Sequence, residues 1–195
     1  FIICCMSAWS DCIMTIIDDD SSSLQAIDTV KRIADSHKVK VTFGVIAKRL
    51  EDDPAIAARL MAFQEEGHEI ASHSYSHSPS IWSRKEYSDG LLARMEEDLV
   101  KADDILRKNG FHPSAFVYPY GKFYGKEYRG NIIGMVQKHY PVAFNARGGF
   151  NHSDNTCFGY VGRLPMRSHN NLSMIKLQMR HAMRKGDCWF VILTH

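Results

Sequence analysis

Residues 12–20, Cys-Ile-Met-Thr-Ile-Ile-Asp-Asp-Asp, join a short apolar run to three consecutive carboxylates. An apolar run of this length, bounded by polar residues, is typical of a strand buried inside a sheet. Ser21 to Ser23 offer N-cap candidates, and apolar residues then repeat at helical spacing over 24–34. The segment predicts a buried strand that carries acidic side chains at its carboxyl end and leads into a helix.

The same alternation of strand and helix continues along the chain. We expect further strands at 39–46, 68–71, 114–118, 142–145, 158–164 and 188–193, and a loop at 151–154. We expect helices at 54–63, 92–106, 128–139 and 172–182. Such alternation predicts an α/β fold with about seven strands in a parallel sheet, which is either open or closed into a barrel.

The bulk composition excludes several classes of partner. The 195 residues include 24 Lys and Arg against 22 Asp and Glu, a formal net charge of +2. This balance gives no reason to expect nucleic acid or an anionic membrane as a partner. No run approaches the roughly 20 apolar residues of a transmembrane segment. We interpret residues 1–195 as a single domain, with residues 1–10 as a candidate leader remnant.

The five cysteines contain no CxxC pair, so we expect no cysteine zinc site. Their odd number argues against a complete disulfide framework. Cys188 lies in an apolar run, and we interpret it as a small core residue.

Two histidines follow the third predicted strand, in His73-Ser-Tyr-Ser-His77. A His-x-x-x-His pair can bring two imidazoles to one cation, and two histidines with one carboxylate leave positions open for water and substrate. The carboxyl ends of parallel strands share one edge of a sheet, so we expect Asp18 to Asp20 nearby. Alone, the aspartates suit a solvated acidic turn as well as they suit a metal site. A histidine pair at this spacing can also arise by chance. The two clusters together favour a catalytic metal site.

Neighbouring side chains on a strand point in opposite directions, so adjacent aspartates cannot both face the metal. We expect one of Asp18 and Asp19 to be a ligand and the other a base that takes a proton from the attacking water. Zinc lowers the pKa of a bound water to roughly 7, so a weak base suffices. Zinc is our first choice of divalent metal, and cobalt, nickel and iron also suit the ligands. His195, after the last predicted strand, is the candidate acid, because histidine titrates near 6.5.

Four motifs resemble those of the NodB-homology polysaccharide deacetylases, carbohydrate esterase family 4. Residues 16–20 resemble the family's Thr-Phe-Asp-Asp-Gly, and residues 73–77 match His-Ser/Thr-x-x-His. Residues 117–121 resemble Arg-x-Pro-x-Gly, and residues 193–195 match Leu-x-His. The order and rough spacing agree, so the resemblance covers nearly the whole chain.

The resemblance implies a distorted (β/α) barrel, often of seven strands. It also implies an enzyme that removes N-acetyl or O-acetyl groups from a polysaccharide or oligosaccharide, outside the cell or in the cell envelope. By motif position it makes Asp18 the base, Asp19 a metal ligand with His73 and His77, and His195 the general acid. The backbone N–H of Tyr120 would stabilise the oxyanion. We further expect substrate contacts from Tyr75, Pro119 and Gly121.

The chain departs from the family pattern at three places. Asp20 stands at the motif-one glycine, and Val117 stands at the motif-three arginine. No Asp-Trp pair precedes His195, although residues 145–147 lie in roughly that region. Arg147 and Arg163 are candidates to supply the missing positive charge, with surface exposure as the alternative for each.

Several aromatic residues lie near the proposed mouth, where aromatic faces stack on sugar rings: Tyr75, Tyr118, Tyr120, Phe123 and Tyr124. For Tyr118, packing in the core is at least as good an interpretation. Two rival functions stay open. One is a haloacid-dehalogenase-like phosphatase that uses Asp18 and Asp20 with magnesium. The other is a non-catalytic relative that only binds carbohydrate.

Overall fold

The computed structural model of the protein describes residues 12–121, 128–148, 150–154, 156–166, 172–184 and 186–194. The leader candidate at 1–10, the aromatic residues Phe123 and Tyr124, and the proposed acid His195 lie outside the described residues.

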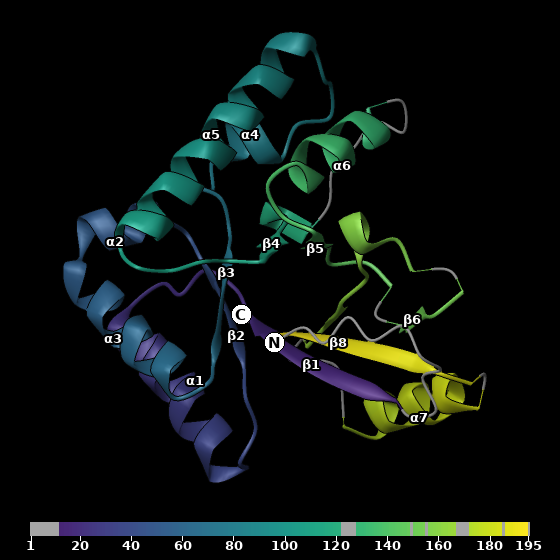
Figure 1. Cartoon of the computed structure of the whole chain (residues 1–195). Helices are drawn as coiled ribbons and strands as arrows, with labels where there is room; N and C mark the ends of the chain where they lie inside the picture. The colour runs from purple at the N-terminus through teal and green to yellow at the C-terminus, as the bar shows by residue number, and fades with distance from the viewer. Residues whose placement is uncertain are drawn as a thin grey trace.

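A curled sheet forms the centre of the molecule (Figure 1). Its strands are β1 (Ile13–Asp18), β2 (Thr42–Val45), β3 (Glu69–Ser72), β4 (Ala115–Val117), β5 (Val142–Phe144), β6 (Phe150–His152), β7 (Leu164–Pro165) and β8 (Cys188–Thr194). Their order is β5-β4-β3-β2-β1-β8-β6, and β7 also pairs with β8. In the described part of the chain β6 alone runs antiparallel to its neighbour.

The two edges of the sheet approach each other through Val161. A bridge joins Phe144 of β5 to Val161, whose N–H donates to the carbonyl of Ala143 at 2.8 Å. Val161 lies shortly before β7, and β7 pairs in parallel with β8. The sheet therefore curls into a distorted barrel, as the family resemblance implied.

Helices cover the outer side of the sheet (Figure 1). They are α1 (Leu24–Ser36), α2 (Lys48–Asp52), α3 (Pro54–Glu65), α4 (Pro79–Trp82), α5 (Asp89–Lys108), α6 (Arg129–Gln137) and α7 (Leu172–Met183), with 3-10 turns η1 (Pro119–Gly121) and η2 (Phe158–Tyr160). Their apolar faces pack inward as the periodicity predicted. On α5, for example, Met95, Leu99, Ala102 and Leu106 are fully buried.

Helix starts follow the local capping signals. Ser23 caps α1, since its side chain accepts a hydrogen bond from the N–H of Ala26 at 3.2 Å. Asp53 caps α3 by accepting from Ala55, and Pro54 occupies the first turn, where no N–H is required. The short helices α2 and α4 had no periodic signal long enough to predict them.

Two expectations about residues 150–165 were wrong. Asn151, predicted to lie in a loop, belongs to β6, because its buried amide accepts from the N–H of Gly162 and donates to the carbonyls of Gly162 and Trp189. These bonds replace the water that an asparagine in a loop would bind. The predicted strand at 158–164 begins instead as the 3-10 turn η2, and only its last residue enters β7.

Cys188 is buried, as expected, but it forms a disulfide with Cys12. The bond joins the amino-terminal ends of the paired strands β1 and β8, across a Cα–Cα distance of 4.8 Å. The odd cysteine count did not reveal this pair, because one bridge needs no even total. Within the described residues, no helix combines the length and apolar character that a membrane crossing requires.

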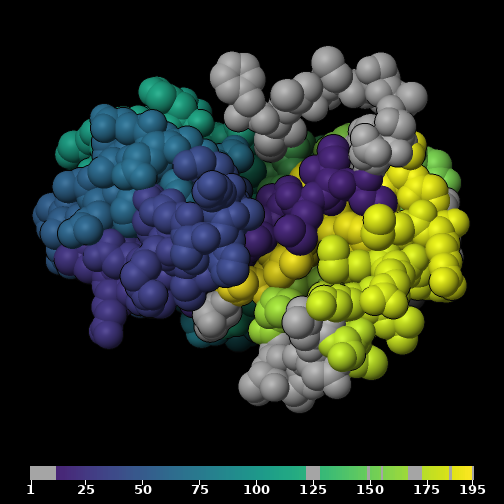
Figure 2. Space-filling model, turned by 90° about the horizontal axis from the view of Figure 1, so that it is seen from below, coloured from purple at the N-terminus to yellow at the C-terminus, as the bar shows by residue number. Residues whose placement is uncertain are grey.

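The start of β1 lies at the surface between two halves of the molecule. Figure 2 shows this strand in purple, with the helices of the amino-terminal half on one side and the carboxyl-terminal part on the other. Ile13 and Met14 are each 49 % exposed, whereas Ile17 and Asp18 at the far end of the strand are buried. Burial therefore increases along β1 toward the carboxylates.

Candidate metal centre

A tight turn follows β1 and separates its three aspartates. The strand ends at Asp18, and the N–H of Asp19 still donates to the carbonyl of Thr194 in β8 at 3.1 Å. Asp20 and Ser21 then adopt left-handed backbone angles, with φ of 75° and 43°. Aspartate tolerates this region because its short polar side chain can bond locally. Residues 18–21, which we call the aspartate turn, thus leave strand geometry after Asp18.

A second tight segment follows β3 and carries the two histidines. We call residues 73–77 the histidine loop. His73 continues the sheet pairing, since its N–H donates to the carbonyl of Val45 at 2.8 Å. Ser74 and His77 have positive φ of 66° and 49°, and the Ser74 hydroxyl oxygen accepts from the N–H of His77 at 3.0 Å. This bend brings the two imidazole rings to a centroid distance of 4.8 Å.

Asp20 is the carboxylate that lies beside the two imidazoles. Its Oδ1 is 3.2 Å from Nε2 of His73 and 3.5 Å from Nε2 of His77. One ligand atom from each residue lies within 4.8 Å of the other two. Among the described residues, this is the group of histidine, cysteine and acidic side chains that is arranged to share one metal ion.

The contacts of His73 determine which of its nitrogens faces Asp20. Nδ1 lies 2.8 Å from the carbonyl oxygen of Val117, which can only accept, so Nδ1 carries the hydrogen. In a neutral ring, Nε2 then directs a lone pair at the carboxylate oxygen of Asp20. Two acceptors at 3.2 Å repel unless a proton or a metal ion lies between them. An imidazole N–H bound to a backbone carbonyl is also the usual orientation of a metal-binding histidine.

Asp18 and Asp19, the predicted base and ligand, form hydrogen bonds with residues other than the two histidines. Asp18 is buried, and its Oδ1 accepts from the hydroxyl of Thr194 at 2.8 Å. Asp19 contacts an arginine instead of the histidines. The physical reason is the turn: alternation of side chains holds only as far as the strand, and the left-handed residue Asp20 redirects the third carboxylate toward the histidine loop.

Arg163 is the partner of Asp19. Its Nη1 and Nη2 donate to the two carboxylate oxygens at 2.5 and 3.0 Å, and its Nε donates to the carbonyl of Asn145 at 2.8 Å. The arginine side chain is fully buried, and that of Asp19 is 7 % exposed. Of the two arginines proposed to supply the missing motif-three charge, Arg163 thus lies against the aspartate turn, whereas Arg147 is exposed.

The Pro119–Gly121 segment forms another wall of the centre. Tyr120 has a φ of 60°, its hydroxyl donates to the carbonyl of His77 at 2.9 Å, and its ring centroid is 4.6 Å from that of His77. Burial, and then the charge of Asp20, raise the pKa of the Tyr120 hydroxyl. Gly121 also has a positive φ, and a Cβ there would lie 2.0 Å from that of Ala146. Only glycine fits this turn.

These elements enclose a cavity of about 440 Å³. Its lining includes the polar side chains of Asp19, Asp20, His73, His77 and Tyr120. The remaining lining residues are Gly121, Ala146, Pro165, Met166 and Leu193. The cavity is therefore bordered both by ionisable groups and by apolar surface, as small-molecule sites commonly are.

Other predicted substrate contacts do not line this cavity. Tyr75 lies under the ammonium of Lys101, 3.7 Å from its ring centroid, on the α5 side of the histidine loop. Tyr118 is buried in the core, where its hydroxyl donates to the carbonyl of Gly159 at 2.9 Å. Pro119 is buried within η1. Of the aromatic residues predicted at the mouth, Tyr120 is the described one that does line the cavity.

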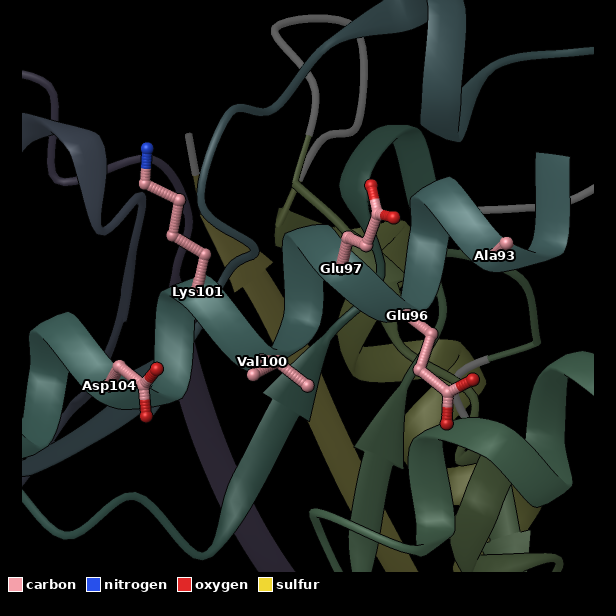
Figure 3. A pocket seen from close by; sticks show the side chains of 6 residues that line it. All are labelled: Ala93, Glu96, Glu97, Val100, Lys101 and Asp104. Atoms are coloured by element: carbon pink, nitrogen blue, oxygen red, sulfur yellow. The ribbon is translucent and has the colours of Figure 1, made fainter. Parts of the chain in front are cut away.

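A second hollow, of about 460 Å³, lies on the outer surface of α5 and is lined by side chains of that helix alone (Figure 3). It holds Glu96, Glu97, Lys101 and Asp104 but none of the side chains around the proposed metal centre. An open acidic helix surface needs no ligand, because water solvates it.

Comparison with known proteins identifies the family of the chain. Residues 10–132, more than half of the chain, match the family model for polysaccharide deacetylase. The peptidoglycan-N-acetylglucosamine deacetylase PgdA of Listeria monocytogenes is 30% identical over 112 residues, which are 55% of this chain and 21% of the relative. The peptidoglycan-N-acetylglucosamine deacetylase of Bacillus cereus is 31% identical over 110 residues, 53% of this chain and 34% of the relative.

The chain therefore spans between a fifth and about a third of the length of these relatives. Among solved structures, the deacetylase PplD of Streptococcus pyogenes has the same fold, with a TM-score of 0.67 and 15% identity over 85% of this chain and 69% of PplD. The match to the family model includes both the aspartate turn and the histidine loop. The chain belongs to the polysaccharide deacetylase family.

Proposed function

We propose that the protein is a metal-dependent hydrolase that removes acetyl groups from an acetylated carbohydrate. The observation that carries this proposal is the convergence of two imidazole nitrogens on one carboxylate oxygen, with His73 and His77 at 3.2 and 3.5 Å from Asp20. Because the family's other members include deacetylases of peptidoglycan by name, the proposed substrate group is N-acetylglucosamine in a cell-wall polymer.

The residues present fit a divalent cation. The set of two imidazoles and one carboxylate suits zinc, cobalt, nickel or iron, and three protein ligands leave positions for water and substrate. The orientation of His73, whose Nδ1 is engaged by Val117, directs its other nitrogen to the shared centre. We therefore assign the ligands as Asp20, His73 and His77, with Asp20 in the place that the family motif implied for Asp19.

A divalent cation at this site supplies Lewis-acid chemistry, in that it polarises an acyl carbonyl and makes water a stronger nucleophile. The chain's own residues supply the rest. We assign the base to Asp19, because it lines the cavity and its carboxylate is held by Arg163. A rigidly held base needs little reorganisation to accept a proton from the attacking water.

Two further assignments rest on the family motifs. The backbone N–H of Tyr120 would donate to the oxyanion, and the positive φ of this residue is an unusual backbone state of the kind found at functional sites. His195 would protonate the leaving amine. It follows Thr194, the last residue of β8, whose carboxyl end lies beside the aspartate turn.

An envelope or extracellular location accompanies this proposal. The curated relatives are named for cell-wall material, and the Cys12–Cys188 disulfide suits an oxidising compartment.

The rival functions receive less support. A dehalogenase-like phosphatase needs Asp18 and Asp20 to act together on one magnesium ion. Asp18 instead bonds to Thr194, while Asp20 lies at the histidines. A protein that only binds carbohydrate would need neither the buried pair of Asp19 and Arg163 nor the convergent ligand set.

The test combines metal content with acetate release. Purified protein is stripped with chelator, reloaded with zinc, cobalt, nickel or iron, and assayed on peptidoglycan, chitin oligomers and acetylated xylan. We expect one equivalent of metal and acetate release that depends on it, with both lost in His73→Ala. Equal metal content in wild type and His73→Ala would refute the site, and metal binding without acetate release on any substrate would favour the non-catalytic alternative.

A further inference from the structure

Helix α5 buries the carboxylate of Asp98 on its inner face. The residue is only 6 % exposed and lies on the apolar face of the helix, between Met95 and Ala102. Neighbouring acidic residues of α5, such as Asp104, are on the outer surface (Figure 3). A buried carboxylate is costly unless hydrogen-bond donors surround it, so its donors indicate what it is there to hold.

The donors to Asp98 come mainly from the middle of the histidine loop. Its Oδ2 accepts from the backbone N–H of Tyr75 at 3.1 Å, and its Oδ1 accepts from that of Ser76 at 3.2 Å. The indole Nε1 of Trp82 also donates to Oδ2, at 2.9 Å. Bonds from N–H groups to an ionised acceptor are stronger than neutral ones, so this carboxylate fixes two consecutive peptide units.

Those two peptide units lie between the proposed metal ligands. His73 is already fixed by the sheet, through its own N–H to Val45 and its Nδ1 to Val117. His77 is five residues from the end of β3, beyond a bend in which Ser74 and His77 itself have positive φ. The position of His77 relative to His73 therefore depends on the segment that Asp98 holds, together with the contacts that His77 makes with Ser74 and Tyr120.

We propose that Asp98 is a positioning residue that sets the separation of His73 and His77 and thereby the metal affinity of the centre. This inference rests on the proposed function, because it requires that the two histidines bind a metal. Asp98 touches neither the metal position nor the substrate cavity, and it acts through the backbone of the histidine loop.

The first experiment measures zinc affinity by competition with a chromophoric chelator, for the wild type and Asp98→Asn. Loss of an outer partner of a metal ligand typically weakens binding by roughly 10–100-fold, and we expect a loss in that range. Asp104→Asn removes the same charge from the exposed side of α5, and it should stay within about 2-fold of the wild type, since solvent separates it from the loop.

The second experiment asks whether the effect passes through His77. If it does, adding Asp98→Asn to His77→Ala should weaken zinc binding further by less than about 3-fold, because the ligand that Asp98 positions is already absent. Additive losses in the double variant would overturn the proposal. So would an unchanged zinc affinity in Asp98→Asn while the wild type binds zinc tightly.

Trp82→Phe separates positioning from general stability. It removes one donor to Asp98 but leaves the amides of Tyr75 and Ser76 in place, so we expect a lower Tm with zinc affinity within about 3-fold of wild type. A loss as large as that of Asp98→Asn would overturn the proposal. Should Asp98→Asn fail to fold, Asp98→Glu keeps the charge and displaces both oxygens. An unchanged zinc affinity in Asp98→Glu would then also overturn the proposal. A wild type that binds no zinc would refute the proposed function itself.

Discussion

The aspartate turn and the histidine loop occupy equivalent places, each directly after a parallel strand, yet they are held by groups of opposite charge. The turn is held by a buried cation, since Arg163 contacts both oxygens of Asp19. The loop is held by a buried anion, since Asp98 accepts from the backbone of Tyr75 and Ser76. Both holding side chains come from other parts of the chain.

The difference follows from what each segment presents inward. The turn presents carboxylates, whose mutual repulsion a guanidinium offsets. The loop bends so that its peptide N–H groups point toward α5, and a carboxylate satisfies them. Asp20 is the residue at which the two segments meet, and each prediction below tests one side of this arrangement.

The largest effect is expected from Asp20→Asn, which removes the negative charge from the proposed ligand set of Asp20, His73 and His77. We expect zinc affinity to fall by more than roughly 100-fold, which is the upper end of the loss seen when a residue that hydrogen-bonds to a metal ligand is removed. We expect acetate release to become undetectable. Zinc titration and an acetate assay measure the two effects. Asp18→Asn, at the last residue of β1, is the matched control and should retain metal. Retention of metal in Asp20→Asn with loss in Asp18→Asn would show that the ligand assignment is reversed.

Arg163→Met removes the cation that holds the aspartate turn. It leaves Asp19 buried without its partner, and breaking a buried ion pair in this way typically costs about 3–5 kcal/mol of unfolding free energy. Urea unfolding measures the loss. The double variant Asp19→Asn with Arg163→Met should recover most of the stability but no acetate release, because the base is absent. A single variant as stable as the wild type would mean that the pair does not hold the turn.

Much of this arrangement was predictable from local patterns. The apolar run before the aspartates predicted β1, and the periodicity of 92–106 predicted the buried face of α5. Because the aspartates and the histidines each follow a parallel strand, they were expected to lie close together. These predictions succeed because burial of apolar surface sets both the spacing of residues and the packing of elements.

The choice among the three aspartates was not predictable in that way. It depends on left-handed angles at Asp20 and Ser21, and no glycine signals them. A motif alignment shifted by one residue would have placed Ser21 at the family's glycine and revealed the alternative. Arg163 bonds across 144 residues of sequence, so no local pattern links it to Asp19. The one signal for Asp98 was a charged residue on an otherwise apolar helix face.

A smaller effect is expected at the strand end, where Thr194 donates to Asp18. Thr194→Val keeps the shape and the strand preference of the side chain but removes this bond, so we expect a loss of about 1–2 kcal/mol in unfolding free energy. Zinc affinity should not change, because Asp18 is outside the ligand set. Thermal unfolding and the zinc titration test both points. A zinc affinity reduced about tenfold would show that Asp18 contributes to the metal centre.

The smallest effect is expected from His68, which directly precedes β3 as His73 directly follows it. Burial, and then the charge of Lys40, lower the pKa of His68 below its usual 6.5, and its Nδ1 accepts from the N–H of Val41 at 3.2 Å. The unfolded chain therefore takes up the proton first as pH falls. Stability from this group is complete above about pH 6.5 and declines below it. Urea unfolding of the metal-free protein at pH 7.5 and 5.5 should show less pH dependence in His68→Gln than in the wild type, whereas His37→Gln, an exposed control, should match the wild type. Equal pH dependence in all three would show that the buried histidine before β3 is not the group that titrates.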